Sequence, residues 1–277
     1  MVAVNQAWSS VKGSVSLRRR CGGAALAADQ APLARRRRNL PWSSMTRVVI
    51  ITGASSGIGQ AAALALAPSS RLLLVARRAD RLAALRDQVR AAGGQAEACA
   101  CDLSAAGAGA PIIARALACF GAIDALVNNA GCYETAAVDA LDEAHAERLW
   151  RLNVLSPMLL ARAAIPVLAR SPTATIITVS SVASDAAFAG SAVYAGSKAA
   201  IEAWSRVARE ELRAQGIRVG VIVPGATATA VWGATMPVAR ERMCQPEDVA
   251  AAIRFMLDAP PSASVDRLVI TPPGGPF

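Results

Sequence analysis

The stretch VVIITGASSGIG, residues 48–59, decides the fold of this chain. Its four consecutive apolar residues, 48–51, predict a strand that is buried on both faces, and the alanine-rich residues 60–67 predict a helix after it. Glycines at positions 53, 57 and 59 form the turn between them. Such a turn lets backbone N–H groups approach a phosphate at the N-terminus of the helix. The stretch therefore predicts the first strand, turn and helix of a nucleotide-binding sheet.

Six more short apolar runs alternate with helical segments through the rest of the chain. Unbroken apolar runs are typical of strands covered on both faces, and strands that alternate with helices pair in parallel. The sequence therefore predicts an α/β fold, a doubly wound parallel sheet of about seven strands with helices on both faces. The strands are expected at residues 48–51, 72–75, 95–101, 123–127, 175–179, 217–223 and 265–271.

The first 44 residues differ in charge from the rest of the chain. They carry eight basic residues against the single acid Asp29, which is +7 of the total net charge of +9 and leaves +2 for residues 45–277. Because this arginine-rich segment lacks hydrophobic periodicity, we interpret it as a disordered extension, followed by one catalytic domain over residues 45–277. Three explanations of the segment compete: Met45 as the natural start, a transit peptide for mitochondrial import, and a secretory signal. We prefer the first.

Charge and composition exclude several classes of partner. The near-neutral body has no basic stripe, so no nucleic acid is expected, and no run of about 18 apolar residues predicts a membrane span. The six cysteines have no paired spacing, which favours free thiols in a reducing compartment and a cytoplasmic location. No metal site is expected.

Tyr194 and Lys198 lie four residues apart in a predicted helix, in a chain with two tyrosines and two lysines. Four residues are about one helical turn, so both side chains rise from the same face. An ammonium group beside a phenol favours the phenolate, so Lys198 is expected to lower the pKa of Tyr194 towards the range useful for acid–base catalysis. The alternative is a surface lysine beside a half-buried tyrosine, and spacing alone favours that alternative.

The end of the second predicted strand indicates which dinucleotide binds. In such folds this position meets the adenosine ribose, where an acidic residue binds the 2′-hydroxyl. Here Ala76 and Arg77 occupy it, and no acid occurs before Asp80. Because a guanidinium group suits a phosphate, we predict NADP(H) as the preferred cofactor, with NAD(H) as the alternative. The other interpretation of Arg77 is an ordinary solvated arginine.

Three later strands also end in small or polar residues. They are Asn128 to Gly131 after the fourth strand, Ser180 and Ser181 after the fifth, and Pro224 and Gly225 after the sixth. Ligands bind at the carboxyl ends of the strands in sheets of this kind. These residues are therefore expected to lie around one site.

From Thr52 onward the chain resembles the short-chain dehydrogenase/reductase family, over essentially residues 46–271. The resemblance implies a Rossmann-like fold, nicotinamide-dependent oxidoreduction and a homodimer or homotetramer. It rests on ordered motifs, which are TGASSGIG at 52–59, NNAG at 128–131, Asn153 in a helix, Ser181 thirteen residues before Tyr194, YxxxK at 194–198 and PG at 224–225.

The resemblance also implies functional residues. The catalytic tetrad would be Asn153, Ser181, Tyr194 and Lys198, with Tyr194 as the acid/base. Adenine would lie against Asp102 and Leu103, and the nicotinamide carboxamide against Thr229. Some NADP-binding members have a basic residue where this chain has Ser56, so that more of the phosphate falls to Arg77. The implied cofactor-binding residues are Gly53, Ser55, Ser56, Gly57, Ile58, Gly59, Arg77, Asp102, Leu103, Asn129, Ala130, Gly131, Tyr194, Lys198, Pro224, Gly225 and Thr229.

These features predict an NADP(H)-dependent oxidoreductase that interconverts a ketone or aldehyde and an alcohol. The segment 182–191 and the loop after Pro224, which includes Trp232 and Met236, are small and apolar, and they favour an uncharged or apolar substrate. Two alternatives on the same fold are a non-catalytic nucleotide sensor and a structural component of an oligomer. The complete tetrad argues against the sensor, whereas apolar helices around Asn153 and Tyr194 would suit a subunit contact.

Overall fold

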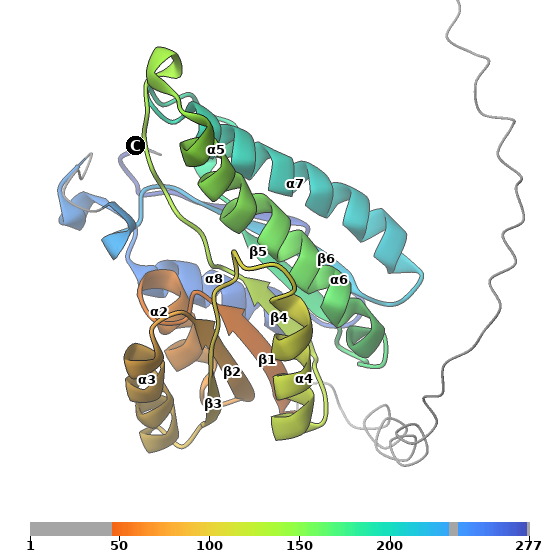
Figure 1. Ribbon diagram of the computed structural model, residues 1–277. Coiled ribbons are helices and arrows are strands. Elements are labelled where there is room, and N and C mark those ends of the chain that lie inside the picture. Colours follow the sequence, from red (N-terminus) through yellow and green to blue (C-terminus); the bar gives the residue numbers. More distant parts are fainter. Residues whose placement is uncertain (1–45, 233–237, 276–277) are drawn as a thin grey trace, which may run out of the picture.

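A seven-stranded sheet forms the centre of the computed structural model, which describes residues 46–232 and 238–275 (Figure 1). All its neighbouring strands are parallel, in the order β3-β2-β1-β4-β5-β6-β7, so the predicted doubly wound sheet is confirmed. The predicted extension over residues 1–44 and Met236 lie outside the described residues. The strands are β1 (Arg47–Thr52), β2 (Ser70–Ala76), β3 (Gln95–Ala100), β4 (Ala125–Asn128), β5 (Thr175–Val179), β6 (Arg218–Pro224) and β7 (Arg267–Ile270).

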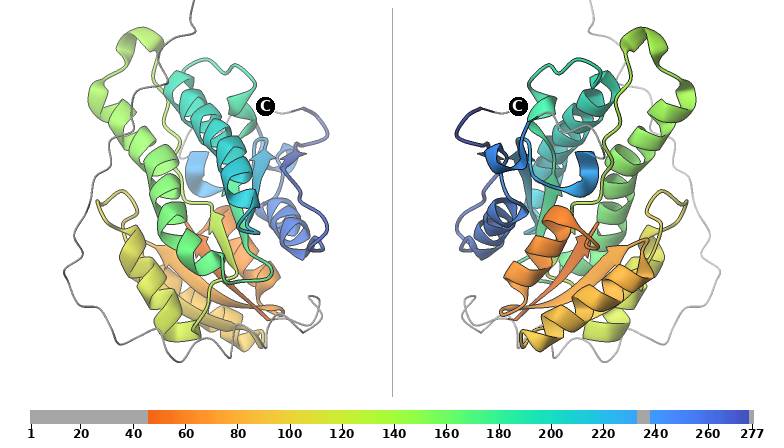
Figure 2. Two further views of the ribbon diagram at one scale, coloured as in Figure 1. Left: turned by 90° about the vertical axis from the view of Figure 1, so that its right-hand side faces the viewer. Right: turned by 90° about the vertical axis from the view of Figure 1, so that its left-hand side faces the viewer.

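Helices cover both faces of the sheet (Figure 2). One layer is formed by α2 (Gly57–Leu66), α3 (Ala79–Ala91) and α8 (Pro246–Asp258), and the other by α4 (Gly109–Phe120), α6 (Ser156–Leu168) and α7 (Ala192–Arg213). The helix α5 (Glu143–Trp150) leads into α6. Short 3-10 helices are η2 (Val138–Ala140), η4 (Val182–Ser184), η5 (Ala230–Trp232) and η6 (Arg240–Arg242).

The apolar runs of the sequence are divided between these two layers. In β1, Val49 and Ile51 pack in the cluster that includes α2 and α8, whereas Ile50 packs in the cluster that includes α4 and α6. Successive side chains of a strand point to opposite faces, so a strand covered on both sides needs apolar residues at every position. This explains why the strands appear as unbroken apolar runs.

The helical stretch from α5 to α6 contains a widened turn. Residues Arg151–Leu155 form a π-helix, in which the N–H of Ser156 bonds to the carbonyl oxygen of Arg151, five residues back. Pro157 follows, and a proline cannot donate to the carbonyl four residues before it and clashes with it in a regular helix. We attribute the widened turn to this proline, because a π-turn displaces that carbonyl group. The turn also carries Asn153.

The same stretch, Glu143–Leu168, is the one helix among the described residues that is long and apolar enough to cross a membrane by length and composition. Its α6 portion packs Leu160, Ala164 and Leu168 into the core against the sheet. We therefore interpret it as a core helix of the fold.

The chain changes direction between β1 and β4, which is where the sheet offers a binding crevice. From β1 the chain continues to β2 and β3 on one side, whereas β4 begins the series that runs to β7 on the other. Loops that leave two such strands in opposite directions leave a crevice outside their carboxyl ends. The residues after Thr52 and after Asn128 border this crevice.

Candidate active site

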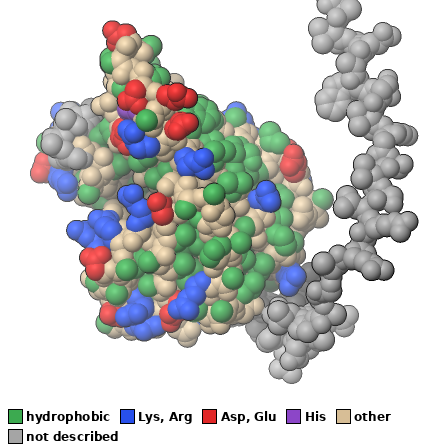
Figure 3. Space-filling model, in the orientation of Figure 1, with side chains coloured by type: hydrophobic (Ala, Val, Ile, Leu, Met, Phe, Trp, Pro, Cys, Tyr) green, Lys and Arg blue, Asp and Glu red, His purple; other side chains and the backbone are tan. Residues whose placement is uncertain are grey.

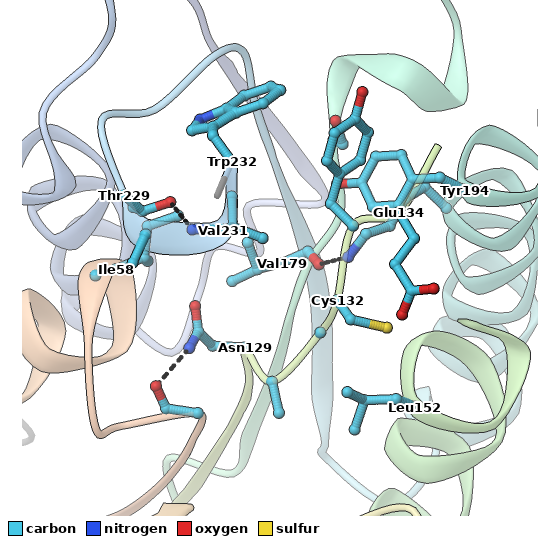
Figure 4. A pocket seen from close by; sticks show the side chains of 18 of the residues that line it. Ile58, Asn129, Cys132, Glu134, Leu152, Val179, Tyr194, Thr229, Val231 and Trp232 are labelled. Carbon is cyan, nitrogen blue, oxygen red and sulfur yellow. Dashed lines mark hydrogen bonds between the residues drawn. The ribbon is translucent and has the colours of Figure 1, made fainter. Parts of the chain in front are cut away.

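A cavity of about 1140 Å³ lies at the carboxyl ends of the strands (Figure 4). Three of the four residues of the predicted tetrad line it, and Asn153 is the exception. Every predicted cofactor-binding residue except Gly59 also lines it. Its volume exceeds the usual range of about 300–1,000 Å³ for a pocket that holds one small ligand. The cavity is therefore large enough for a dinucleotide together with a second molecule.

The glycine-rich turn after β1 is held in place by Asn129. The side-chain amide of Asn129 donates to the carbonyl oxygen of Thr52 at 2.8 Å, and the hydroxyl of Thr52 accepts from the backbone N–H groups of Asn129 and Ala130 at 2.9 and 3.0 Å. Gly53 has φ of 66°, a left-handed conformation that favours glycine. A Cβ atom on Gly59 would lie 2.4 Å from the carbonyl oxygen of Gly53. The turn and the NNAG segment thus form one rigid wall.

Two arginines border the cavity beside this turn. Arg77 is exposed, as a residue that meets a ligand from the rim would be. Arg78, which the sequence did not single out, donates through Nη2 to the hydroxyls of Ser55 and Ser56 at 2.9 and 3.0 Å. The guanidinium group of Arg78 therefore sits directly on the glycine-rich turn.

Further along the crevice, Asp102 and Leu103 follow β3. The carboxylate of Asp102 accepts from the backbone N–H and the hydroxyl of Ser104 at 2.9 and 2.7 Å. These hydrogen bonds lower the pKa of Asp102. Leu103 is buried next to it, so that this part of the cavity combines an acidic group with an apolar wall.

At the other end of the cavity, Tyr194 and Lys198 lie on one face of α7, as predicted. The ammonium nitrogen of Lys198 lies 5.7 Å from the centroid of the Tyr194 ring and donates to the carbonyl oxygen of Val179 at 3.0 Å. Ser181, at the end of β5, is hydrogen-bonded to Tyr194 through its side chain. Two separate elements, α7 and the segment after β5, thus bring a phenol, a hydroxyl and an ammonium group together.

The expectation that Lys198 lowers the pKa of Tyr194 is wrong for this arrangement. Desolvation raises the pKa of Tyr194 to about 12, and the hydrogen bond with Ser181 offsets only part of that increase. Burial also lowers the pKa of Lys198 to about 8. Burial therefore makes the charged form of Lys198 less favourable than it is in water. The ammonium donates its hydrogen bond to the carbonyl oxygen of Val179, and not to the phenol. Burial outweighs the effect of the neighbouring charge.

Asn153 acts on the backbone around the cavity. Its side chain accepts from the N–H of Cys132 at 2.9 Å and donates to the carbonyl oxygen of Cys132 at 3.0 Å. It also donates to the hydroxyl of Ser197 at 3.2 Å. Asn153 thus joins the NNAG segment to α7, and a Cβ atom on Gly131 would lie 3.1 Å from its Oδ1 and 3.5 Å from Nζ of Lys198.

The loop after β6 closes the cavity from a third side. Pro224 and Gly225 are buried, and the methyl group of Thr229 faces Gly57, where an added Cβ atom would lie 2.9 Å away. Figure 4 shows Thr229 beside Ile58, with Trp232 further along the same wall. The predicted apolar lining is present in large part: it includes Val182, Ala183, Ala187, Phe188, Val231 and Trp232, but not Ala186.

A buried carboxylate behind the site was not anticipated. Glu202, one turn after Lys198 on α7, accepts from the hydroxyl of Ser180 at 2.7 Å and from Nε of Arg267 at 3.0 Å. Arg267 also pairs with Asp185 in the segment after Ser181. Glu202 therefore ties the helix, the end of β5 and β7 together. The sequence feature that could have identified Glu202 is its position four residues after Lys198, because that spacing places both side chains on the same helix face.

The crevice, the glycine-rich turn and the tyrosine–serine–lysine group are the arrangement that the sequence predicts for an oxidoreductase of the short-chain dehydrogenase family. The sequence profile of the short chain dehydrogenases matches residues 47–237, and the chain belongs to this family. It is 37% identical over 224 residues to an uncharacterized oxidoreductase of Methylorubrum extorquens, covering 76% of this chain and 90% of that protein.

Two solved structures are similar over nearly their whole length. An alcohol dehydrogenase from the archaeon Thermococcus sibiricus, complexed with 5-hydroxy-NADP, has a TM-score of 0.78 at 27% identity and covers 83% of this chain and 98% of its own. A 7α-hydroxysteroid dehydrogenase, complexed with NADH and 7-oxo glycochenodeoxycholic acid, has a TM-score of 0.78 at 28% identity and covers 86% and 99%. Relatives of this chain therefore include proteins bound to either type of nicotinamide dinucleotide.

Proposed function

We propose that this protein is an NADP(H)-dependent oxidoreductase that interconverts a ketone or aldehyde and an alcohol, with Tyr194 as the acid/base. The observation that carries the proposal is the meeting of Tyr194, Ser181 and Lys198 in the cavity that the glycine-rich turn also borders. A phosphate-binding turn and a proton donor in one cavity are what a hydride-transfer site requires.

Tyr194 and Ser181 would bind the substrate oxygen. Both hydroxyls can donate a hydrogen bond to a carbonyl oxygen, and donors already in place stabilise the negative charge that develops there. When bound, the dinucleotide supplies or accepts the hydride. Tyr194, with its pKa of about 12, is protonated near neutral pH and gives its proton to the oxygen during reduction. The raised pKa therefore keeps Tyr194 in the protonated form that reduction requires.

Lys198 and Asn153 would support this chemistry from behind. Lys198, whose ammonium lies at the carboxyl end of β5, would hold the nicotinamide ribose and stabilise the phenolate that remains after proton transfer. Asn153 fixes the backbone of Cys132 and the start of the Lys198 turn through Ser197, and would hold the water that links Lys198 to solvent. Both roles depend on placement, and neither residue needs to contact the reacting carbon.

The dinucleotide fits the residues of the cavity. Gly53, Gly57 and Gly59 leave the turn free of side chains, and added Cβ atoms there would meet neighbouring atoms at 2.4–2.9 Å. Arg77 and Arg78 are two cations at the end of β2, where the adenosine 2′-position falls in such folds. Because a 2′-phosphate would be matched by guanidinium groups, the pair supports NADP(H) over NAD(H).

The direct experiment is to follow oxidation of NADPH, and separately of NADH, by the purified protein with a panel of ketones and aldehydes. The proposal expects turnover with NADPH and a higher kcat/KM for NADPH than for NADH. A protein that binds NADPH but turns over none of these carbonyl compounds would instead be the sensor considered from the sequence.

The proposal extends to partners and location. The side of the molecule formed by α6 and α7 exposes Leu155, Leu159 and Val207, and Figure 3 shows apolar side chains gathered on this face. A homodimer or homotetramer would cover them, and light scattering at micromolar concentration tests this.

A cytoplasmic location is supported by the cysteines of the described part, which are free.

A further inference from the structure

Aromatic side chains are concentrated around the reacting end of the cavity. Within the described ranges the chain has eight aromatic residues, and four of them line the cavity: Tyr133, Phe188, Tyr194 and Trp232. The aromatic content of the whole chain is only 4%, so this is a marked local enrichment. Tyr133, Phe188 and Trp232 have no part in the proton or hydride chemistry proposed above, and they need another explanation.

Tyr133 and Trp232 make one continuous wall beside Tyr194. The ring of Tyr133 lies edge-to-face against Tyr194 with centroids 4.9 Å apart, and against Trp232 with centroids 5.1 Å apart. At these separations the rings touch, which leaves no room for a substrate between them. A substrate held at Tyr194 must therefore lie against the outer surface of this wall. Figure 4 shows Trp232 on the loop after β6 and Tyr194 on α7, the two elements between which this wall extends.

The polar atoms of the wall are already bonded to the protein. The hydroxyl of Tyr133 lies 3.2 Å from the hydroxyl of the buried Ser191, and the indole N–H of Trp232 donates to the carbonyl oxygen of Thr227 at 2.7 Å. These bonds fix the orientation of both rings. The surface left for a ligand is then mostly aromatic carbon, which attracts other rings through edge-to-face and offset-stacked contacts.

Several charged groups lie at the mouth of the cavity: Glu147 and Arg151 line it beside the pair formed by Glu134 and Arg148. Glu134, the neighbour of Tyr133, forms an ion pair with Arg148 at 3.0 Å at the exposed mouth of the cavity. Facing residues of the segment after Ser181 are small and apolar, including Ala183 and Ala187. The arginines near the glycine-rich turn lie at the other end of the cavity, after β2. The environment next to Tyr194 therefore suits a neutral ring.

We propose that Tyr133 and Trp232 form an aromatic wall that selects carbonyl substrates bearing a flat, uncharged ring next to the carbonyl group. The proposal rests on the proposed function and deepens it by naming a substrate class. Aromatic pair contacts at a single wall would favour an aryl ketone over its saturated counterpart by about three- to tenfold beyond burial of the ring.

The test uses two ketones of the same skeleton, acetophenone and cyclohexyl methyl ketone, and compares the ratio of their kcat/KM values between variants. Because both substrates are used with every variant, the intrinsic difference in reactivity cancels. Tyr133→Leu and Trp232→Leu are expected to lower the aryl-to-cyclohexyl ratio by about three- to tenfold. Tyr133→Phe keeps the ring and should leave the ratio within about twofold of the wild type.

Phe255→Leu is the matched control, since it removes an exposed aromatic ring on α8, outside the cavity. The proposal is overturned if the ratio is unchanged in both leucine variants of the wall, or if it falls equally in the control. Dissociation constants of the two ketones, measured with NADPH bound in the Tyr194→Phe background, repeat the comparison without turnover. Failure of the wild type to reduce either ketone would count against the proposed function for this substrate class. The ratio of the two dissociation constants would still test whether the aromatic wall prefers the aryl ketone.

Discussion

Lys198 should make the stability of this protein rise with pH. Burial lowers the pKa of its side chain from 10.5 to about 8 in the folded protein. Between these two pH values the unfolded chain binds more protons than the folded one, so the free energy of unfolding increases as the pH rises. For these two pKa values, the increase between about pH 7 and pH 10 is about 2–3 kcal/mol. Below about pH 7 the cost of the buried charge is present in full.

The comparison is with Lys198→Met, which keeps a long side chain and removes the charge. Urea denaturation of both proteins across this pH range gives the difference in unfolding free energy, in which the titration of all other groups cancels. The difference should shift by about 2–3 kcal/mol in favour of the wild type. Such a shift would show that the ammonium is costly to bury next to the phenol.

Tyr194→Phe is the control. Burial raises the pKa of Tyr194 to about 12, so its contribution has the opposite sign and is lost as the pH rises above about 10. Below about pH 10 the change in the free energy of unfolding that Tyr194 causes stays under about 1 kcal/mol. If the difference between wild type and Lys198→Met is flat across the range, Lys198 titrates at its ordinary pKa and the account of its burial fails.

Three further predictions concern the walls of the cavity. Gly59→Ala should destabilise the protein by about 1–3 kcal/mol, because its Cβ atom would lie 2.4 Å from a carbonyl oxygen of the turn; an unchanged midpoint of urea unfolding would refute the close packing. Arg78→Ala should weaken NADPH binding by about 10- to 100-fold and leave NADH binding unchanged, as measured by calorimetry. An equal loss of affinity for both dinucleotides would mean that Arg78 only stabilises the glycine-rich turn and does not bind the 2′-phosphate. Arg77→Ala is measured in parallel. Glu202→Gln should lower the free energy of unfolding by about 1–3 kcal/mol, because it weakens two hydrogen bonds of a buried carboxylate. A thermal midpoint equal to that of the wild type would show that these hydrogen bonds do not stabilise the fold.

Much of the fold was predictable because the sheet is covered on both faces. Each strand needs apolar side chains at every position, which makes it an unbroken run, and the predicted 175–179 agrees with β5. The ends of other strands moved by one or two residues, as in β1, which begins at Arg47. Strand ends depend on pairing with neighbours, which a local pattern does not contain.

The gathering of the candidate residues around one cavity was predictable where ordered motifs carried it, and other contacts depended on residues distant in sequence. Arg78 reaches Ser55 and Ser56 across 23 and 22 residues, so its position follows from the fold alone. The pKa of Tyr194 was predicted in the wrong direction because spacing reveals a neighbouring charge but not the loss of solvent. Glu202 was missed for a similar reason, since its partners come from β5 and β7.

The most direct test of the proposed mechanism is Tyr194→Phe, assayed for NADPH-dependent carbonyl reduction and for NADPH binding. The variant keeps the ring and removes the proton donor, so turnover should fall by about 10²- to 10⁴-fold. The dissociation constant of NADPH should change by no more than about threefold, because the glycine-rich turn and the arginines proposed to bind the phosphates are untouched. Tyr133→Phe, which removes the hydroxyl of the other tyrosine, should retain turnover. Wild-type turnover in Tyr194→Phe would contradict the assignment of Tyr194 as the proton donor.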